Sequence, residues 1–439
     1  MAQRTLLTGP TLRFDGNPMT APWQEAVRID TNGAVLIEGT RIAAVGEAAA
    51  LRAAHPDAQV RHHGATQLIC PGFVDAHVHY PQTAIIASWG KRLIDWLNTY
   101  TFPEEMRLGD PAYADTIAAR YLDLALDHGT TTVASYCTIH PHSVDALFEA
   151  AAARGMSVVA GKTCMDRNAP EGLRDTAQSA YDDSKRLIHR WHGKGRATYA
   201  ITPRFTPTST PEQLAALGAL WHEHPDCLIQ THLSEQTDEI AWVRALHPQA
   251  RDYLDTYETQ GLLSERAVFG HAIHLTPREV DRIAETGAAL VHCPTSNTFI
   301  GSGLFDMTLA GRGIPCGLAT DTGGGSSFSM LRTMAAAYEI GQLRGTPLHA
   351  AHLIWLATAG SARTLHLEDR LGTLAPGKAA DITVLDLAST PAIAQRAEAA
   401  HDIWEQLFAT IMMGDDRAVA EVWVHGQKRR RPTPPPLLA

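Results

Sequence analysis

One repeated pattern between Leu68 and Leu343 constrains the fold more than any other feature of this 439-residue chain. A short apolar run rich in Val, Ile, Ala and Thr is followed by a polar loop and then by an amphipathic stretch with helical spacing. This alternation is typical of βα units on a parallel sheet. The expected strands are 72–78, 131–136, 157–162, 197–202, 227–232, 267–271, 288–292 and 315–320. Eight such units predict an α/β fold with a (β/α)8 TIM-like barrel.

The helices between these strands carry their own start signals. Thr210 and Thr276 each precede a proline, and each stands three residues before a glutamine or glutamate, Gln213 and Glu279. This is the spacing of a capping box with proline at the first helical position. The sequence therefore predicts helices at these places on evidence that is independent of hydropathy.

Short β-type segments flank the barrel on both sides. Residues 34–37 and 41–45, separated by Gly39-Thr40, predict a hairpin, and residues 382–385 and 419–424 predict further strands. We expect these pieces to form a small β-sandwich domain built from the N- and C-terminal segments. The predicted division assigns 1–69 and 368–439 to this small domain and its tail, and 70–367 to the barrel.

Composition and charge exclude several classes of function. Hydrophobic residues make up 45% of the chain and charged residues 19%, which indicates a globular protein with a sizeable core. A net charge of −10 argues against binding nucleic acid through its phosphates. The basic end from Lys428 to Arg431 is accordingly interpreted as a solvated, frayed terminus.

The cysteines and the apolar runs bear on where the protein works. None of the six cysteines forms a C-x-x-C pair, which favours reduced thiols over a disulfide scaffold or a cysteine zinc site. We find no run of 18 uncharged apolar residues and no secretory leader at the start of the sequence. The prediction is a cytoplasmic protein that binds neither membrane nor nucleic acid.

Histidines gather where the expected strands end. His77 and His79 are two residues apart in the first strand, so their side chains share a face. His232 closes the fifth strand, His271 the sixth and Asp321 the eighth. Barrel enzymes build their active sites at this end of the strands. A zinc ion held there by three or four side chains lowers the pKa of a bound water to about 7 and supplies hydroxide for a hydrolysis.

Other histidines and a glycine run near strand ends receive a simpler interpretation. Gly323-Gly324-Gly325 matches neither a dinucleotide nor a P-loop motif, and it predicts a flexible loop that lets the backbone approach a ligand. Four further histidines are interpreted as loop or second-face residues: His140, His142, His274 and His292.

These strand-end residues carry a family resemblance. The string from Pro71 to His79, with His232, His271 and Asp321, resembles the amidohydrolase superfamily, and finer motifs resemble its guanine deaminase family. The finer motifs are Tyr80-Pro81-Gln82, Asp95-Trp96-Leu97, Thr202-Pro203-Arg204-Phe205, His232-Leu233-Ser234-Glu235 and Cys293-Pro294-Thr295-Ser296-Asn297. The resemblance spans residues 30 to 390 approximately. It implies hydrolytic deamination of guanine to xanthine and ammonia, with a metal-activated hydroxide attacking C2.

The resemblance also implies a metal centre. By the family pattern one metal ion, zinc with iron as the alternative, is held by four residues, His77, His79, His232 and Asp321. His271 then stands beside the metal-bound water and Asp321 takes its proton. Members with two metals usually bridge them by a lysine at the end of the fourth strand, where this chain has Pro203-Arg204. We therefore expect one ion and interpret Lys162 as a structural charge partner.

Roles for the substrate-binding residues follow from the same motifs. Glu235 is placed to deliver protons to N3 of guanine and to the departing amine, as catalytic and substrate-binding residue at once. Arg204 suits the O6 and N7 acceptors, which a guanidinium bridges with two hydrogen bonds. Gln82 offers an amide to a purine edge. The apolar walls for a flat base are Trp96, Leu97 and Phe205.

Two alternative functions remain open at this point. The first is a related amidohydrolase that acts on 8-oxoguanine, cytosine or another heterocycle, or a ring-opening hydantoinase. The second is an inactive amidohydrolase-like scaffold. The sequence argues against it, because every ligand position and position 235 hold residues that can perform the chemistry. The resemblance implies a homodimer whose small-molecule partner is a purine base.

Overall fold

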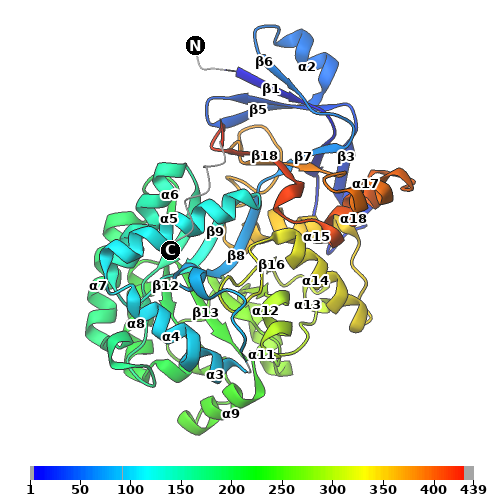
Figure 1. Ribbon diagram of the computed structural model, residues 1–439. Coiled ribbons are helices and arrows are strands. Elements are labelled where there is room, and N and C mark those ends of the chain that lie inside the picture. Colours follow the sequence, from blue (N-terminus) through cyan, green and yellow to red (C-terminus); the bar gives the residue numbers. More distant parts are fainter. Residues whose placement is uncertain (1–3, 91, 430–439) are drawn as a thin grey trace.

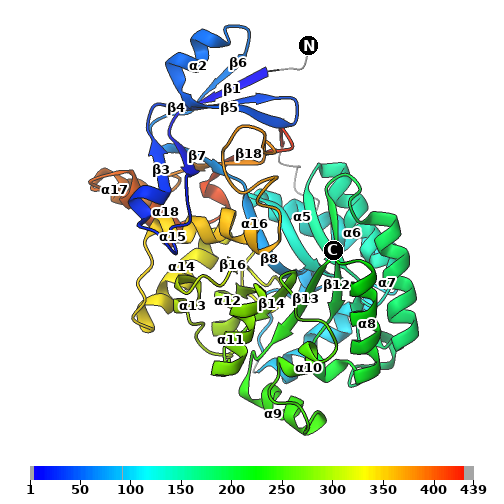
Figure 2. The ribbon, with the colours of Figure 1, turned by 180° about the vertical axis from the view of Figure 1, so that it is seen from behind.

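The computed structural model describes residues 4–90 and 92–429. Figures 1 and 2 show a barrel surrounded by helices and, beside one end of it, sheets that the two ends of the chain build together. Within the described residues no helix is both long and apolar enough to cross a bilayer.

Parallel strands follow one another around the barrel in chain order. They are β8 (Phe73–His79), β9 (Thr130–Tyr136), β10 (Ser157–Gly161), β12 (Ala197–Pro203), β13 (Leu228–Leu233), β14 (Ala267–His271), β15 (Ala289–His292) and β16 (Cys316–Leu318). A short β11 (Thr163–Cys164) pairs with β12. The eight predicted barrel strands are confirmed, with small shifts at their ends.

The barrel closes between its last and first strands through loop residues. The amide of Asp321 donates to the carbonyl of His77 over 3.0 Å, and the amide of His79 donates to the carbonyl of Thr322 over 3.1 Å. Since β16 ends at Leu318, the expectation that Asp321 closes the eighth strand is wrong. Asp321 lies in the loop beyond, where its own backbone is left-handed with φ of 48°.

Helices cover the outside of the barrel (Figure 2). The longer ones are α5 (Pro111–Asp127), α6 (Pro141–Arg154), α7 (Ala177–Trp191), α8 (Pro211–Glu223), α9 (Thr237–Leu246), α11 (Pro277–Thr286) and α14 (Met330–Leu343). The capping box at Thr276 is confirmed. Thr210 caps α8 as predicted, but Gln213 does not complete the box, because its side chain donates to Asp175 over 2.6 Å instead.

Shorter helices fill the loops around the barrel. In the loops that follow β8, β13 and β15 lie α3 (Leu93–Trp96), α4 (Phe102–Arg107), α10 (Asp255–Glu258) and α12 (Pro294–Phe299), with a π-helical turn over Leu97–Thr101, and α13 (Thr308–Gly311) precedes β16. Later in the chain come α15 (Ala350–Trp355), α16 (Ser361–Thr364), α17 (Pro391–Glu398) and α18 (Ile403–Met413).

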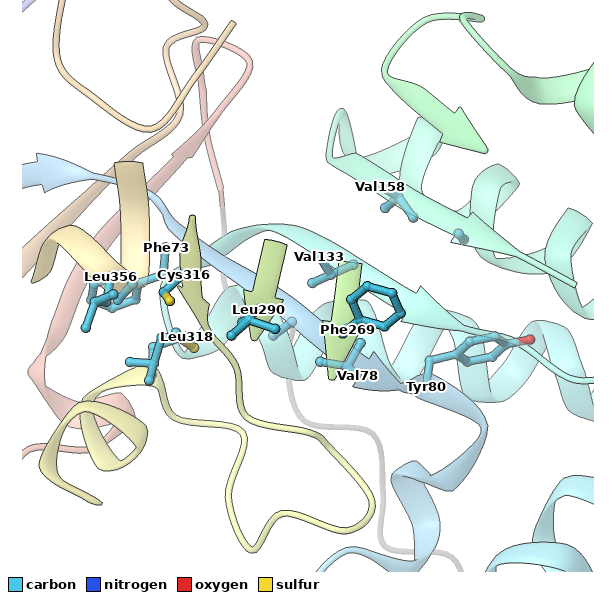
Figure 3. Close-up of a cluster of buried hydrophobic side chains, with 14 of the residues drawn as sticks. Phe73, Val78, Tyr80, Val133, Val158, Phe269, Leu290, Cys316, Leu318 and Leu356 are labelled. Carbon is cyan, nitrogen blue, oxygen red and sulfur yellow. The ribbon is translucent and has the colours of Figure 1, made fainter. Parts of the chain in front are cut away.

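Alternation along the barrel strands creates two apolar cores. Figure 3 shows side chains such as Val133, Phe269 and Leu290, which pack between the strands and the helices. A second cluster unites Val74, Ala134, Val159, Leu228, Val268 and Val291 with leucines that follow α16. The pairing of β8 with β9 shifts register between Phe73 and Val74 and again between Asp75 and Val78, so the strand is irregular around His77 and is regularly paired again at His79.

The two ends of the chain form a pair of sheets. The first has the order β5 (Arg41–Glu47), β4 (Gly33–Glu38), β1 (Arg4–Thr8), β6 (Gln59–His62) and is covered by α2 (Ala48–Ala54). The second has the order β19 (Gln427–Lys428), β18 (Val419–Val424), β17 (Ile382–Asp386), β7 (Gln67–Pro71), β2 (Thr11–Phe14), β3 (Val27–Asp30), with α1 (Trp23–Ala26) before β3. The predicted hairpin and the predicted strands at 382–385 and 419–424 are confirmed.

These two sheets share one core. Leu7 and Val35 from the first sheet pack with Ile69, Ile382 and Trp423 from the second. The predicted sandwich of N- and C-terminal segments is confirmed by this shared core. The predicted boundary at residue 69 falls inside β7, and α18, within the predicted C-terminal segment, packs against α14 of the barrel.

The basic end of the chain is more ordered than expected where it is described. Lys428 lies in β19 and pairs with Glu421, and Arg429 pairs with Asp123 of α5 over 2.6 Å. The expectation of a solvated terminus is therefore wrong for these two residues, because acidic partners from other elements face them. The rest of this basic segment, from Arg430 on, lies outside the described residues.

Candidate active site

The strand ends bring four of the predicted residues into contact distance. One ring nitrogen each of His77, His79 and His232 lies within 4.8 Å of the others, and the Nε2 atoms of His79 and His232 are 3.1 Å apart. Asp321 Oδ1 lies 3.7 Å from Nε2 of both His77 and His79. All four side chains are buried. The four predicted metal ligands therefore face one small volume.

The hydrogen bonds of these side chains leave ligand atoms bare. His232 Nδ1 lies 2.7 Å from the carbonyl oxygen of Arg204, which only accepts, so the proton is on Nδ1 and Nε2 keeps its lone pair. His77 Nε2 and Asp321 Oδ1 are buried without a hydrogen-bond partner among the described residues. Buried polar atoms are normally paired, so this arrangement fits a bound cation.

Electrostatics point the same way. Burial, reinforced by neighbouring positive groups such as His271 and Arg204, lowers the pKa of His77, His79 and His232 well below the ordinary value of histidine. The three rings are therefore neutral. Neutral imidazole nitrogens together with a carboxylate oxygen are a typical donor set for zinc.

A competing set of His77, His271 and Cys293 is close enough to hold a metal but has the wrong chemistry. Burial raises the pKa of the Cys293 thiol, which disfavours the thiolate that binds metals. Burial alone would lower the pKa of His271, but the carboxylates of Glu235 and Asp321 outweigh it and raise the pKa above the ordinary value. A ring that holds its proton more tightly is a weaker metal ligand, so the set with His79 and His232 fits better.

His271 lies between two carboxylates beside the ligand set. Its Nε2 is 3.6 Å from Glu235 Oε2 and 3.8 Å from Asp321 Oδ2, and its Nδ1 donates to Asn297 Oδ1 over 2.8 Å. His271 and Asp321 both have a left-handed backbone, as does Ser234 at the end of β13. Strained backbone of this kind clusters at active sites.

Glu235 is held by contacts that no sequence motif indicates. Ser302 Oγ accepts from Gln236 Nε2 over 3.1 Å and therefore directs its own hydrogen to Glu235 Oε1, over 2.7 Å. The backbone amide of Glu235 donates to Glu239 Oε2 over 2.9 Å. Burial, followed by the negative charge of Glu235, raises the pKa of Glu239 to about 7. Oε2 of Glu235 is left to face His271 and the cavity.

One cavity unites three of the four predicted metal ligands with every predicted substrate-binding residue, whereas His77 is not among its lining residues. It is lined by His79, His232, His271, Asp321, Glu235, Gln82, Trp96, Leu97, Arg204 and Phe205, and also by Leu93, Thr101, Ile300 and Gly324. Gly324 belongs to the glycine run, which therefore approaches the cavity as expected. Leu93, Thr101 and Ile300 are residue types common in any core, so the sequence carries no signal for them.

Glu105 of α4 is the main site residue that the motifs do not reveal. It is completely buried, and both of its oxygens accept from Arg204 Nη1, over 3.0 and 2.8 Å. Its Oε1 also accepts from Gln82 Nε2 over 2.9 Å. Arg204 therefore shares its guanidinium with a carboxylate of the protein through Nη1, because a buried cation needs a buried partner.

The residues that were given structural interpretations stay outside the cavity. Lys162 forms a buried ion pair with Asp175, as expected of a structural charge partner. None of His140, His142, His274 and His292 lines the cavity. His292 is fully buried and stacks on Phe305 with ring centroids 4.7 Å apart.

Comparisons with known proteins agree on one family. The amidohydrolase family model matches residues 68–429, and a model of an imidazolonepropionase-like composite domain from bacteria matches residues 33–58. The guanine deaminase of Escherichia coli (strain K12) is 44% identical over 404 residues, which are 92% of each chain. A probable guanine deaminase of Deinococcus radiodurans is 40% identical over 424 residues, which are 94% of this chain and 96% of that protein.

Two solved structures are similar along almost the whole chain. The structure of E. coli guanine deaminase has a TM-score of 0.94 at 42% identity and covers 97% of this chain and 99% of its own. The structure of guanine deaminase from C. acetobutylicum with guanine in its active site has a TM-score of 0.88 at 27% identity and covers 97% of this chain and 100% of its own.

Proposed function

Because this chain belongs to the amidohydrolase family, we propose that its cavity performs the reaction of its relatives, the hydrolytic deamination of guanine to xanthine and ammonia. The observation that carries this function is the one cavity that His79, His232, Asp321, Glu235 and Arg204 line together, with His77 beside two of these ligands. A flat base between the apolar walls meets donors for its carbonyl edge on one side and the hydrolytic groups on the other. The protein is accordingly an enzyme.

We infer that His77, His79, His232 and Asp321 hold one divalent ion, zinc with iron as the alternative. When bound, such an ion lowers the pKa of a water molecule to about 7 and supplies hydroxide for attack on a carbon atom. A single ion is proposed because β12 ends at Pro203, followed by Arg204, with no lysine to bridge a second ion.

Metal analysis of the purified active protein tests this assignment. We expect one tightly held divalent ion per chain, since the bare nitrogen and oxygen atoms described above converge on one volume. Two ions per chain, or active protein without metal, would contradict it. Mass spectrometry of the intact protein under native conditions gives the count directly.

The chain's own residues orient the base and move the protons. Arg204 presents its remaining N–H groups to O6 and N7, so C2 of guanine faces the ligand set. Glu235 Oε2 carries a proton to N3 as oxygen adds to C2. Asp321 then accepts the proton of the hydroxyl group at C2, this proton is passed to Glu235, whose own proton is now on N3, and Glu235 delivers it to the amino group, so that the C–N bond breaks to leave xanthine and ammonia. His271 Nε2, between both carboxylates, keeps their oxygens apart and oriented.

An assay of ammonia release tests the proposed substrate against the alternatives. Metal-loaded protein is incubated separately with guanine, 8-oxoguanine and cytosine, and with dihydrouracil, whose ring opening releases no ammonia and is measured by its loss of ultraviolet absorbance. We expect guanine to react with the highest kcat/KM. Faster reaction of another base, with guanine unreactive, would replace guanine by that heterocycle, and reaction of none of them would favour an inactive scaffold.

The substitution Arg204→Lys tests how the carbonyl edge is recognised. Lysine keeps the charge beside Glu105 but loses the planar fork, so we expect kcat/KM on guanine to fall by the equivalent of about 1–3 kcal/mol. The loss on 2-aminopurine is expected to be smaller, because that base has no O6 to contact. Equal losses on both bases, at unchanged metal content, would assign Arg204 a scaffolding role.

We also propose that the protein works as a cytoplasmic homodimer whose small-molecule partner is a purine base. Six buried, unpaired cysteines support a reducing compartment. Light scattering on the purified protein measures the oligomeric state, and a monomer at micromolar concentration would contradict the dimer.

A further inference from the structure

Glu105 is a buried carboxylate that the proposed reaction does not use. It lies on α4, outside the ligand set, and no part of its side chain is exposed. Its side chain contacts the two residues that face the carbonyl edge of the base, Arg204 and Gln82. Glu105 therefore determines the charge and the hydrogen-bond direction that Arg204 and Gln82 offer to a ligand in the cavity.

The first consequence concerns the direction of hydrogen bonds. An ionised carboxylate only accepts, so Gln82 must point its Nε2 toward Glu105 Oε1. Arg204 spends Nη1 on both oxygens of Glu105, and no other acceptor among the described residues binds its Nη2 or Nε. The Phe102 ring, with its centroid 5.6 Å from the guanidinium carbon, covers a face of the same group. Arg204 therefore offers a fixed pair of donors to a ligand.

The second consequence concerns charge. Arg204 and Glu105 form an ion pair of 2.8 Å, and their side chains are only 4% and 0% exposed. Without Glu105, the buried guanidinium of Arg204 would lack its carboxylate partner and would strongly prefer an anionic ligand at this edge of the cavity. With Glu105, a neutral base meets a neutral pair, and an anionic base becomes the uncompensated charge.

We propose that Glu105 is the specificity-determining residue that makes this cavity bind neutral purine bases and reject purine anions. This inference rests on the proposed function, because guanine is neutral and its product xanthine, with a second ring carbonyl, loses a proton more readily. Glu105 thus favours the substrate on entry and weakens binding of the product once it ionises.

Binding measurements with two bases that do not turn over test the proposal. Hypoxanthine keeps the O6 and N7 acceptors of guanine but lacks the amino group and stays neutral, whereas xanthine in weakly alkaline buffer is largely a monoanion. Calorimetry gives a dissociation constant for each base. For the unchanged protein we expect hypoxanthine to bind more tightly than the xanthine anion.

Glu105→Gln keeps the size of the side chain and removes its charge. We expect this variant to shift the ratio of the two dissociation constants toward xanthine by about 10-fold or more, because the cation of Arg204 is then unpaired. The matched control is Glu104→Gln. Glu104 is the neighbouring buried glutamate of α4, but its partners are Arg107 and Tyr113, away from the cavity. We expect the control to leave the ratio unchanged.

The outcomes separate a charge effect from a structural one. Equal shifts of the ratio in both variants, or no shift in Glu105→Gln, would overturn the proposal. If Glu105→Gln does not fold, binding to the unchanged protein still tests the proposal. Tighter binding of the xanthine anion than of hypoxanthine would overturn the proposal. Selective binding of hypoxanthine without turnover of guanine would contradict the proposed reaction while leaving the role of Glu105 intact.

Discussion

Glu235→Gln is expected to lower kcat on guanine by about 10²–10⁴, the usual contribution of a positioned general acid or base. Glutamine keeps the size of the side chain and an oxygen that can accept from Ser302, but it has no proton to transfer to N3 or to the leaving amine. The metal content is expected to stay constant, because Glu235 lies outside the ligand set. Steady-state kinetics and metal analysis on the same preparation measure both quantities.

A second buried glutamate provides the control for this variant. Glu279 is equally buried, its oxygens accept from the backbone amides of Leu254 and Thr276, and none of these three residues lines the cavity. Glu279→Gln is expected to lower Tm and to leave kcat near that of the unchanged protein. Turnover of Glu235→Gln close to that of the unchanged protein would place proton transfer on another residue.

His79→Ala is expected to lose the bound metal and to reduce kcat by about 10³-fold or more, because the hydroxide available at neutral pH depends on the metal. Alanine removes one of the four converging ligands, the ring whose Nε2 lies 3.1 Å from Nε2 of His232. Metal analysis after dialysis, together with kcat at saturating guanine, measures the two effects.

His292→Leu is the matched control for the metal ligand. His292 is also a buried histidine at the end of a barrel strand, but it lies outside the cavity lining, and neither ring nitrogen has a hydrogen-bond partner among the described residues. Leucine removes two unpaired polar atoms from a core, a change that is expected to raise Tm or leave it constant. Equal loss of metal from both variants would show that removing any buried histidine at a strand end releases the metal. His79 would then not be identified as a ligand.

Local patterns in the sequence are sufficient for the barrel strands and for the architecture, although they do not predict β1, β2, β3, β6 and β7 of the small domain. The apolar runs predict the eight barrel strands because burial on a parallel sheet requires a continuous hydrophobic segment. The hairpin of β4 and β5 is predicted by its turn at Gly39-Thr40, and the start of α11 by Thr276. Each of these features depends on residues that are neighbours in the chain, so a local sequence pattern is enough to predict it.

The ligand set is predicted by one further rule, that the carboxyl ends of barrel strands meet on one face. This rule places His77, His79, His232 and His271 together without any knowledge of distances. It fails in detail at Asp321, which reaches the same volume from a loop with left-handed backbone rather than from the end of β16. The left-handed turn is absent from the expectation because nothing in the residue types around Asp321 requires it.

The sequence by itself therefore determined the barrel, the sandwich and the chemistry-bearing residues, and the tertiary structure alone decided what supports them. Glu105 meets Arg204 across 99 positions of chain, and Ser302 meets Glu235 across 67. Both contacts join loops or short helices whose paths follow no periodicity, so no spacing in the sequence indicates them. The physical reason is desolvation: a buried charge requires a partner, but only the packed loops determine which partner reaches it.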